Sequence, residues 1–262
     1  MPSRWPDVAE LRAVCQPPQI RARSSSEHWV AHVIGRRVSI HLTRLCVGLG
    51  LSANAVTVSM IVIGWAAAAA LLIPGLLGPL LACALAITQI IVDSVDGEVA
   101  RWRGTSGPVG VFLDRLAHAT TEAAFPMALG IAVTLHEADD FKAATVGAAM
   151  AALVLVIKSL NDYVRIARGA DALDQDRGRP EVATPRPAAL RAIYGAAHYL
   201  PIHRLYHSVE QSLVILACAL AGTIFGFNGL TVALFVLAIP LPFVVAGHAL
   251  AILTSRRLEG PA

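Results

Sequence analysis

Six long hydrophobic runs constrain the fold of this 262-residue chain more than any other feature. Each run is close to the roughly 20 residues that an α-helix needs to cross the hydrocarbon core of a bilayer. A mean hydropathy of +0.62 agrees with this interpretation, because soluble domains are seldom so apolar. The runs are residues 54–74, 78–98, 110–135, 141–166, 209–226 and 229–253. The chain is therefore predicted to be an all-α integral membrane protein with six transmembrane helices.

The segment that precedes the first run has a different character. Residues 27–50 mix apolar side chains with three arginines, a composition typical of an amphipathic helix that lies in the membrane interface. We therefore expect residues 1–50 to form an N-terminal segment with an interfacial helix, and residues 51–262 to form the six-helix membrane domain. Residues 169–208, rich in proline and arginine, are expected to be a loop or interfacial segment of that domain.

The distribution of basic residues predicts the orientation. Of the 21 Lys and Arg, 18 lie before residue 54, in the segments 101–103 and 165–204, or after residue 255. Because loops rich in Lys and Arg stay in the cytoplasm, we expect both termini and these two loops to be cytoplasmic, with the protein in the cell membrane. The net charge of only +3 gives no indication of a nucleic-acid partner.

Ionisable residues gather where the second run meets the third, in the sequence IVDSVDGEVARWRGTSGPVGVFLDRLAHATTEA. On a helix, Asp93, Asp96 and Arg101 share one face. Asp114 and His118 are four residues apart on the next helix, which the intervening turn folds back against the first. Three carboxylates on facing helices need cations between them, since like charges at close range repel. Oxygen ligands of this kind favour Mg²⁺ or Mn²⁺.

Small residues on the same two faces would leave room beside the expected metal ions. Gly97 and Ala100 lie on the first face and Gly110 lies on the second. Taken singly, an aspartate near a helix end is usually a solvated cap, and a lone histidine is usually packed or hydrogen-bonded. That alternative does not require small residues at fixed offsets, so we favour a binding site for a bulky phosphorylated ligand.

The spacing from Asp93 to His118, D-x2-D-G-x2-A-R-x8-G-x3-D-x3-H, resembles a known signature. It is similar to D-x2-D-G-x2-A-R-x8-G-x3-D-x3-D of the CDP-alcohol phosphatidyltransferases. The segment LSANAVT at residues 51–57 is similar to the Pro-Asn-x-x-Thr motif of that family, with Ala53 in place of the proline. The six-helix layout and the cytoplasmic site are also shared, whereas residues 167–208 show no specific match.

The resemblance implies an enzyme of phospholipid biosynthesis. Such enzymes transfer a phosphatidyl group from a CDP-linked lipid, typically CDP-diacylglycerol, to an acceptor alcohol and release CMP. The resemblance also implies two divalent ions, Mg²⁺ or Mn²⁺, and a homodimer. The implied metal ligands are Asp93, Asp96, Asp114 and His118, and the residues implied to line the CDP site are Gly97, Ala100, Arg101 and Gly110.

His118 departs from the family pattern, in which the last aspartate is taken to be both a metal ligand and the general base. Imidazole is largely neutral at cytoplasmic pH and can accept a proton, and its nitrogen can ligate a metal ion. Two interpretations stay open: an active enzyme with a histidine base, or a catalytically degenerate member that acts as a membrane binding or scaffold protein. Glu122, one turn further on, is a candidate for the missing carboxylate.

The acceptor site is less constrained by the sequence. Lys158 and Arg165 lie near the predicted cytoplasmic end of the fourth run, where they would bind a phosphate of the acceptor. The alternative is an ion pair between Lys158 and Asp162, with Arg165 reaching the lipid headgroups. A small membrane transporter is the rival from another class, but transporters place such residues near the bilayer midplane rather than at helix ends.

Overall fold

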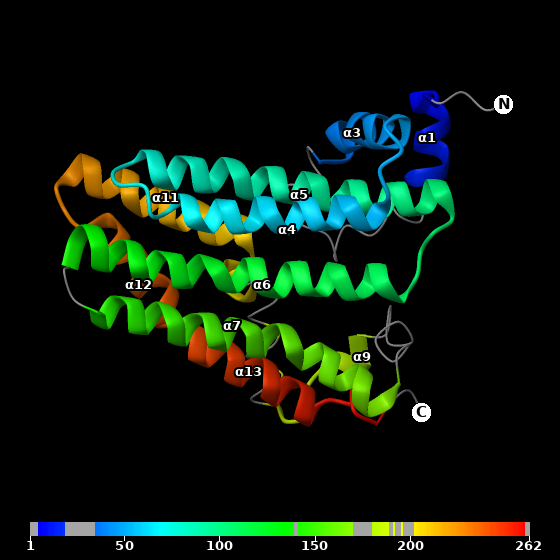
Figure 1. Cartoon of the computed structure of the whole chain (residues 1–262). Helices are drawn as coiled ribbons and strands as arrows, with labels where there is room; N and C mark the ends of the chain where they lie inside the picture. The colour runs from blue at the N-terminus through cyan, green and yellow to red at the C-terminus, as the bar shows by residue number, and fades with distance from the viewer. Residues whose placement is uncertain are drawn as a thin grey trace. The chain divides into compact units, whose positions relative to one another are not determined.

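The computed structural model describes residues 5–18, 35–138, 141–169, 180–188, 191, 195 and 202–259. These residues form helices, turns and loops, and no β-strand occurs among them (Figure 1). Six helical segments are long and apolar enough to cross a membrane: Ala53–Ala70, Leu77–Arg103, Pro108–Glu137, Phe141–Arg168, Ser208–Phe225 and Gly229–Thr254. The prediction of an all-α protein with six membrane-spanning helices is confirmed. The chain divides into two compact units, Met1–Ala124 and Phe125–Ala262.

Three long helices form the membrane part of the first unit: α4 (Ala53–Ala70), α5 (Leu77–Arg103) and the first half of α6 (Pro108–Val133). α4 lies alongside α5 (Figure 1). The turn predicted between the second and third runs is present, because α5 ends at Gly104 and α6 begins at Pro108. Gly104 has a φ of 63°, a left-handed conformation that glycine adopts without steric cost and that commonly ends a helix.

Two shorter helices pack against the C-terminal half of α5, α1 (Val8–Cys15) and α3 (Arg36–Gly48) (Figure 1). Leu11, Cys15 and Ile40 form a fully buried cluster that joins α1 to α3, and Trp102 of α5 packs against it. α3 is the described part of the predicted interfacial helix, whose residues 27–34 lie outside the described residues. α1 was not predicted from the sequence.

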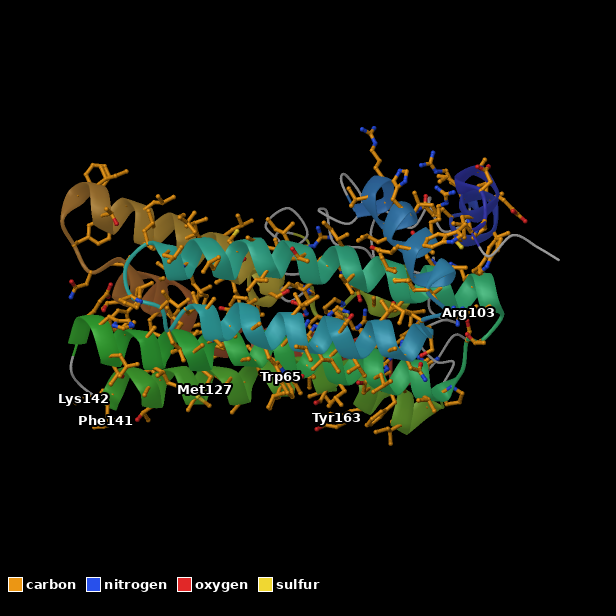
Figure 2. All side chains as sticks on the ribbon, turned by 45° about the horizontal axis from the view of Figure 1, so that its top comes forward. Trp65, Arg103, Met127, Phe141, Lys142 and Tyr163 are labelled. Carbon is orange, nitrogen blue, oxygen red and sulfur yellow. The ribbon has the colours of Figure 1, made fainter. Side chains whose placement is uncertain are left out.

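The second unit contains α7 (Phe141–Arg168), α11 (Ser208–Phe225), α12 (Gly229–Ala238) and α13 (Leu241–Thr254). The sixth apolar run is thus two helices rather than one. The break falls at Pro240, which has no N–H group to donate within a helix. Phe141 lies at one end of α7 and Tyr163 lies towards the other, and both side chains are exposed (Figure 2). Exposed aromatic side chains near the ends of a helix are expected where the helix faces lipid.

The connections in the second unit are ordered by specific contacts. After α6 the chain makes a short π-helical turn, η2 (Thr134–Ala138). The Glu137 carboxylate accepts hydrogen bonds from the backbone N–H groups of Leu230, at 3.1 Å, and Thr231, at 2.7 Å. It therefore caps the N-terminus of α12, where backbone donors have no partner within the helix. The predicted loop at 169–208 contains α9 (Pro180–Ala183) and η3 (Ile202–Tyr206).

Two glycines bring the second half of α6 against α7. A Cβ atom added at Gly147 would lie 2.5 Å from the carbonyl oxygen of Pro126, and one added at Gly130 would lie 2.5 Å from that of Ala143. Such distances leave no space for a side chain. In lipid, no hydrophobic effect drives helices together, so the close approach of helix backbones is a common source of stability.

We predict that Gly147→Val lowers the free energy of unfolding of the purified protein in mild detergent by about 1–3 kcal/mol, the usual cost of overpacking. Gly247→Val in α13 is the matched control, because nothing lies within 4 Å of a Cβ atom added at that position. Both changes add the same side chain to a membrane helix. Equal stability of the two variants would contradict the close contact between α6 and α7.

Candidate metal centre

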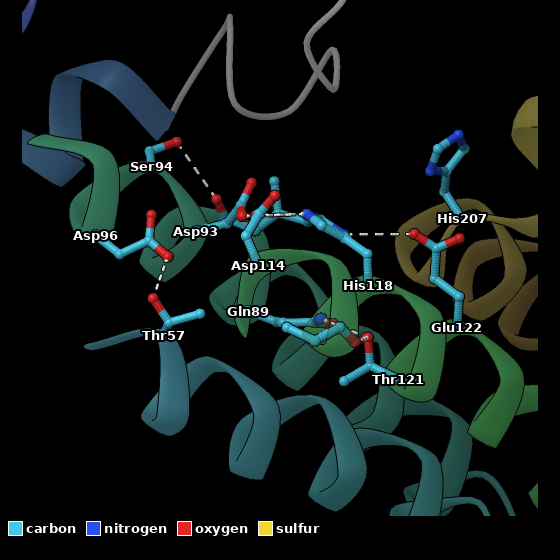
Figure 3. A network of polar contacts seen from close by, with 12 residues as sticks. Thr57, Gln89, Asp93, Ser94, Asp96, Asp114, His118, Thr121, Glu122 and His207 are labelled. Carbon is cyan, nitrogen blue, oxygen red and sulfur yellow. Dashed lines mark hydrogen bonds and ion pairs between the residues drawn. The ribbon is translucent and has the colours of Figure 1, made fainter. Parts of the chain in front are cut away.

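Helices α5 and α6 bring three of the predicted ligands together. Asp93, Asp114 and His118 each offer one ligand atom, and these atoms lie within 4.8 Å of one another. His118 Nε2 lies 3.2 Å from Asp93 Oδ1 and 3.5 Å from Asp114 Oδ1 (Figure 3). The side chains are 27%, 49% and 29% exposed for Asp93, Asp114 and His118, so soluble ions can reach them.

Asp96 lies one turn beyond Asp93 on α5 but is not part of this group of three. Its Oδ2 atom accepts a hydrogen bond of 2.7 Å from the buried hydroxyl of Thr57 (Figure 3). A short hydrogen bond to a carboxylate is stronger than one between neutral groups, so Thr57 holds the Asp96 side chain against α4. Sequence reasoning missed this contact, although Thr57 ends the segment LSANAVT that resembles a family motif.

Glu122 lies on the opposite side of the imidazole from the two aspartates. Its Oε1 atom is 3.5 Å from His118 Nδ1, and its side chain is only 2% exposed (Figure 3). A carboxylate beside one imidazole nitrogen fixes the ring orientation and the position of its proton, as in many metal-binding histidines. Its contact with Nδ1 places Glu122 behind His118, where it orients the ring.

A buried polar contact fixes the helices beneath the cluster. Gln89, one turn before Asp93, is fully buried, and its Nε2 donates a hydrogen bond of 2.9 Å to Thr121 Oγ1 (Figure 3). Gly64 of α4 makes space for this pair, because a Cβ atom there would lie 2.4 Å from Thr121 Cγ2. The spacing of α4, α5 and α6 is therefore set by well-packed contacts just below the candidate ligands.

The predicted nucleotide-binding positions lie on the same two helices, and all four are partly exposed: Gly97, Ala100, Arg101 and Gly110. A Cβ atom added at Gly97 would lie 3.1 Å from Arg101 Nη1, so the guanidinium group lies over this glycine. A Cβ atom added at Gly110 would make only an ordinary contact, 3.7 Å from Asn54 Oδ1.

In the second unit, the predicted acceptor-binding residues have polar neighbours on or near α7. Arg165 Nη1 contacts Asp162 Oδ1 at 3.2 Å, and Lys158 Nζ lies 3.4 Å from His207 Nδ1. Asp162 thus contacts Arg165, which lies one turn further along α7.

Six apolar helices, with two carboxylates and an imidazole gathered on two of them, define a membrane protein with a candidate metal centre. A family model, CDP-alcohol phosphatidyltransferase, matches residues 51–225, which is more than half of the chain. The chain therefore belongs to the CDP-alcohol phosphatidyltransferase family, and the resemblance noted in the sequence is confirmed. No curated protein matches the chain in a sequence comparison.

The grouped side chains fit a divalent ion chemically. Two carboxylate oxygens suit a hard cation such as Mg²⁺, and the imidazole nitrogen adds a donor that Mn²⁺ accepts more readily. Partial exposure gives an ion access without full burial of the charges.

We predict that the purified protein binds Mn²⁺ and that Asp93→Asn or Asp114→Asn weakens the binding at least about tenfold, because each change removes a charged ligand. Asp162→Asn serves as the matched control, since Asp162 is similarly exposed but pairs with Arg165. Free Mn²⁺ measured by electron paramagnetic resonance gives the affinity. If neither aspartate variant differs from the control, the metal centre lies elsewhere.

Proposed function

We propose that this protein transfers a phosphatidyl or similar phospholipid group from a CDP-linked lipid, such as CDP-diacylglycerol, to an acceptor alcohol and releases CMP. The observation that carries this proposal is the convergence of Asp93, Asp114 and His118 within the segment that the family model matches. Membership of the family supports a transferase acting on CDP-alcohols in the membrane, with divalent metal as cofactor.

The proposed reaction moves one phosphoryl group. The acceptor hydroxyl oxygen forms a bond to the β-phosphorus of the CDP-lipid, and the bond from that phosphorus to the bridging oxygen breaks. CMP leaves with the electron pair, and the hydroxyl proton passes to a base. Such transfers depend mainly on positioning and on stabilising charge. Two bound divalent ions would supply charge neutralisation at the attacking and leaving oxygens.

In this proposal Asp93, Asp96 and Asp114 hold the ions, and His118 serves as the base. Because the single free lone pair of the imidazole cannot bind an ion and accept a proton at once, His118 is an ion ligand only when it is not acting as the base. Glu122 beside Nδ1 favours a proton on that nitrogen, which leaves Nε2 as the basic nitrogen on the side of Asp93 and Asp114.

The nucleotide is proposed to lie over the small residues of the same faces. Gly97, Ala100 and Gly110 leave space for it, and the Arg101 guanidinium lies over Gly97. A planar guanidinium group is well suited to phosphate oxygens, because it presents several N–H donors in one plane. In the second unit, Lys158 and Arg165 are proposed to bind a phosphate on the acceptor; their positive charges on α7 support this role.

The protein is further proposed to be a homodimer in the cell membrane, with both termini and the active site on the cytoplasmic side. The location of 18 of 21 Lys and Arg supports this orientation. Tight glycine contacts of the kind seen at Gly130 and Gly147 show that small residues in these helices permit close packing. Two alternatives predict different experimental results: a degenerate member that binds the CDP-lipid without turnover, and a small transporter.

We predict CMP release when the purified protein is incubated with CDP-diacylglycerol, Mg²⁺ or Mn²⁺, and a panel of acceptor alcohols. Asp93→Asn should abolish the release because a metal ligand is lost, and Glu259→Gln, an exposed surface change, should leave it intact. Absence of CMP under every metal and acceptor would favour the binding protein. Ion flux into vesicles without CMP release would favour the transporter.

His118 variants separate an enzyme from a degenerate relative. We predict that His118→Ala lowers turnover about 10²–10⁴-fold, the usual effect of losing a general base, while binding of the CDP-lipid largely survives. His118→Asp restores the family pattern and should retain or raise activity with Mg²⁺. A degenerate protein would instead release no CMP until the aspartate is introduced. If His118→Ala is unimpaired in an active protein, another group accepts the proton.

A further inference from the structure

A buried carboxylate lies on the opposite side of α5 from the metal centre. Glu98 follows Asp96 by two residues, and its side chain points the other way around the helix, with 2% exposure. Its Oε1 atom accepts hydrogen bonds of 2.7 Å from both Gln16 Nε2 and Ser39 Oγ. Its Oε2 atom accepts one of 2.5 Å from Thr43 Oγ1. Glu98 therefore joins three donors from two other parts of the N-terminal segment.

These contacts tie α1 and α3 to α5 in one register. Gln16 is the residue that ends α1, and it also donates to the carbonyl oxygen of Arg36 at the start of α3, at 2.9 Å. Ser39 and Thr43 are one turn apart on the buried face of α3. A carboxylate is costly to bury unless several donors meet it. An apolar residue here would allow α1 and α3 to pack on α5 in several positions, whereas three donors that converge on one carboxylate fix a single position.

The end of α1 in turn fixes an arginine of the nucleotide site. Cys15 Sγ donates to the backbone oxygen of Glu98 at 3.3 Å, and the carbonyl oxygen of Cys15 accepts a hydrogen bond of 2.8 Å from Arg101 Nε. With Nε held in this way, Arg101 Nη1 lies over Gly97, on the face that carries the aspartates. The direction of the guanidinium group thus depends on where α1 ends.

We propose that Glu98 is a positioning residue that docks α1 and α3 on α5 and thereby aims the Arg101 guanidinium at the phosphates of the CDP group. The inference rests on the proposed function in one respect, the assignment of CDP to this site. On this proposal the N-terminal helices contribute to substrate binding as well as lying at the membrane interface. Their removal or displacement would impair nucleotide binding without touching a metal ligand.

The first test measures the Kd of CDP in the presence of Mg²⁺. Glu98→Leu leaves the three donors without their acceptor and should weaken CDP binding about 10- to 100-fold, the effect of one lost charge-assisted contact. Glu98→Gln keeps one oxygen that can accept hydrogen bonds and adds an N–H group that can donate one to Thr43 Oγ1. This variant should therefore bind CDP nearly as the native protein does. Because Glu98 acts through Arg101, Glu98→Leu should add little to the effect of Arg101→Ala.

The second test reports docking without any substrate. Cys15 is fully buried, and burial, with a smaller effect of Glu98, raises the pKa of its thiol to about 11. Because only the thiolate is alkylated, Cys15 in docked α1 should react slowly with iodoacetamide. Glu98→Leu should accelerate its alkylation at least about tenfold, measured by mass spectrometry of the peptide that contains it. Tyr206→Phe, which removes a buried hydrogen bond to Leu237 in the second unit, is the control for general destabilisation.

The two measurements distinguish a failure of the docking role of Glu98 from a failure of the proposed CDP site. Slow Cys15 alkylation in Glu98→Leu, equal to that in Tyr206→Phe, would overturn the docking role. Multiplicative losses of CDP affinity in the double variant would overturn action through Arg101. If the native protein and Arg101→Ala bind CDP equally weakly, the proposed substrate is wrong, and so is the role of Glu98 in CDP binding. Fast alkylation of Cys15 in Glu98→Leu would in that case support the docking role alone.

Discussion

The cost of placing charged groups in long apolar helices governs the arrangement of the first unit. Asp93 and Asp114 approach one another beside His118, whose Nε2 lies within 3.5 Å of an oxygen of each. Two carboxylates at such range repel unless a cation or a hydrogen-bond donor stands between them, and in the proposed site that cation is a divalent ion. The same requirement applies on the far side of α5, where Glu98 is buried among three donors. In both places the acidic residue determines what must pack beside it.

These two carboxylate contacts make α5 the helix on which the unit is organised. One face meets α4 and α6 through Asp96, Asp93 and the Gln89 contact with Thr121. The other meets α1 and α3 through Glu98. A helix anchored on both faces holds the side chains between them in fixed directions, and Arg101 is one of these. Preorganised groups of this kind are what a phosphoryl-transfer site requires, since positioning accounts for most of its chemistry.

The sequence predicted those features that depend on local periodicity. The six apolar helices follow from run length, and the grouping of Asp93, Asp114 and His118 follows from helical spacing and a short turn. The sequence could not predict α1, since eight residues carry too little apolar pattern to stand out. Nor could it predict the partners of Glu98, which lie 55 to 82 residues away along the chain. Such contacts arise only when separate segments pack, and no local spacing encodes them.

The balance of charge around His118 bears on whether the substitution preserves the chemistry of the family. The usual signature ends in a fourth aspartate, and an imidazole in its place removes one negative charge. Glu122 places a second acidic group one step further out, because its buried side chain contacts Nδ1 of the same imidazole at 3.5 Å. A carboxylate that hydrogen-bonds a metal-binding histidine raises the basicity of the ring and passes part of its charge to the other nitrogen. In the proposed site, His118 and Glu122 together would therefore present the cluster with a partly anionic, oriented ligand. The pair, rather than the histidine alone, would then stand in for the aspartate, which is the arrangement that the proposed active enzyme requires.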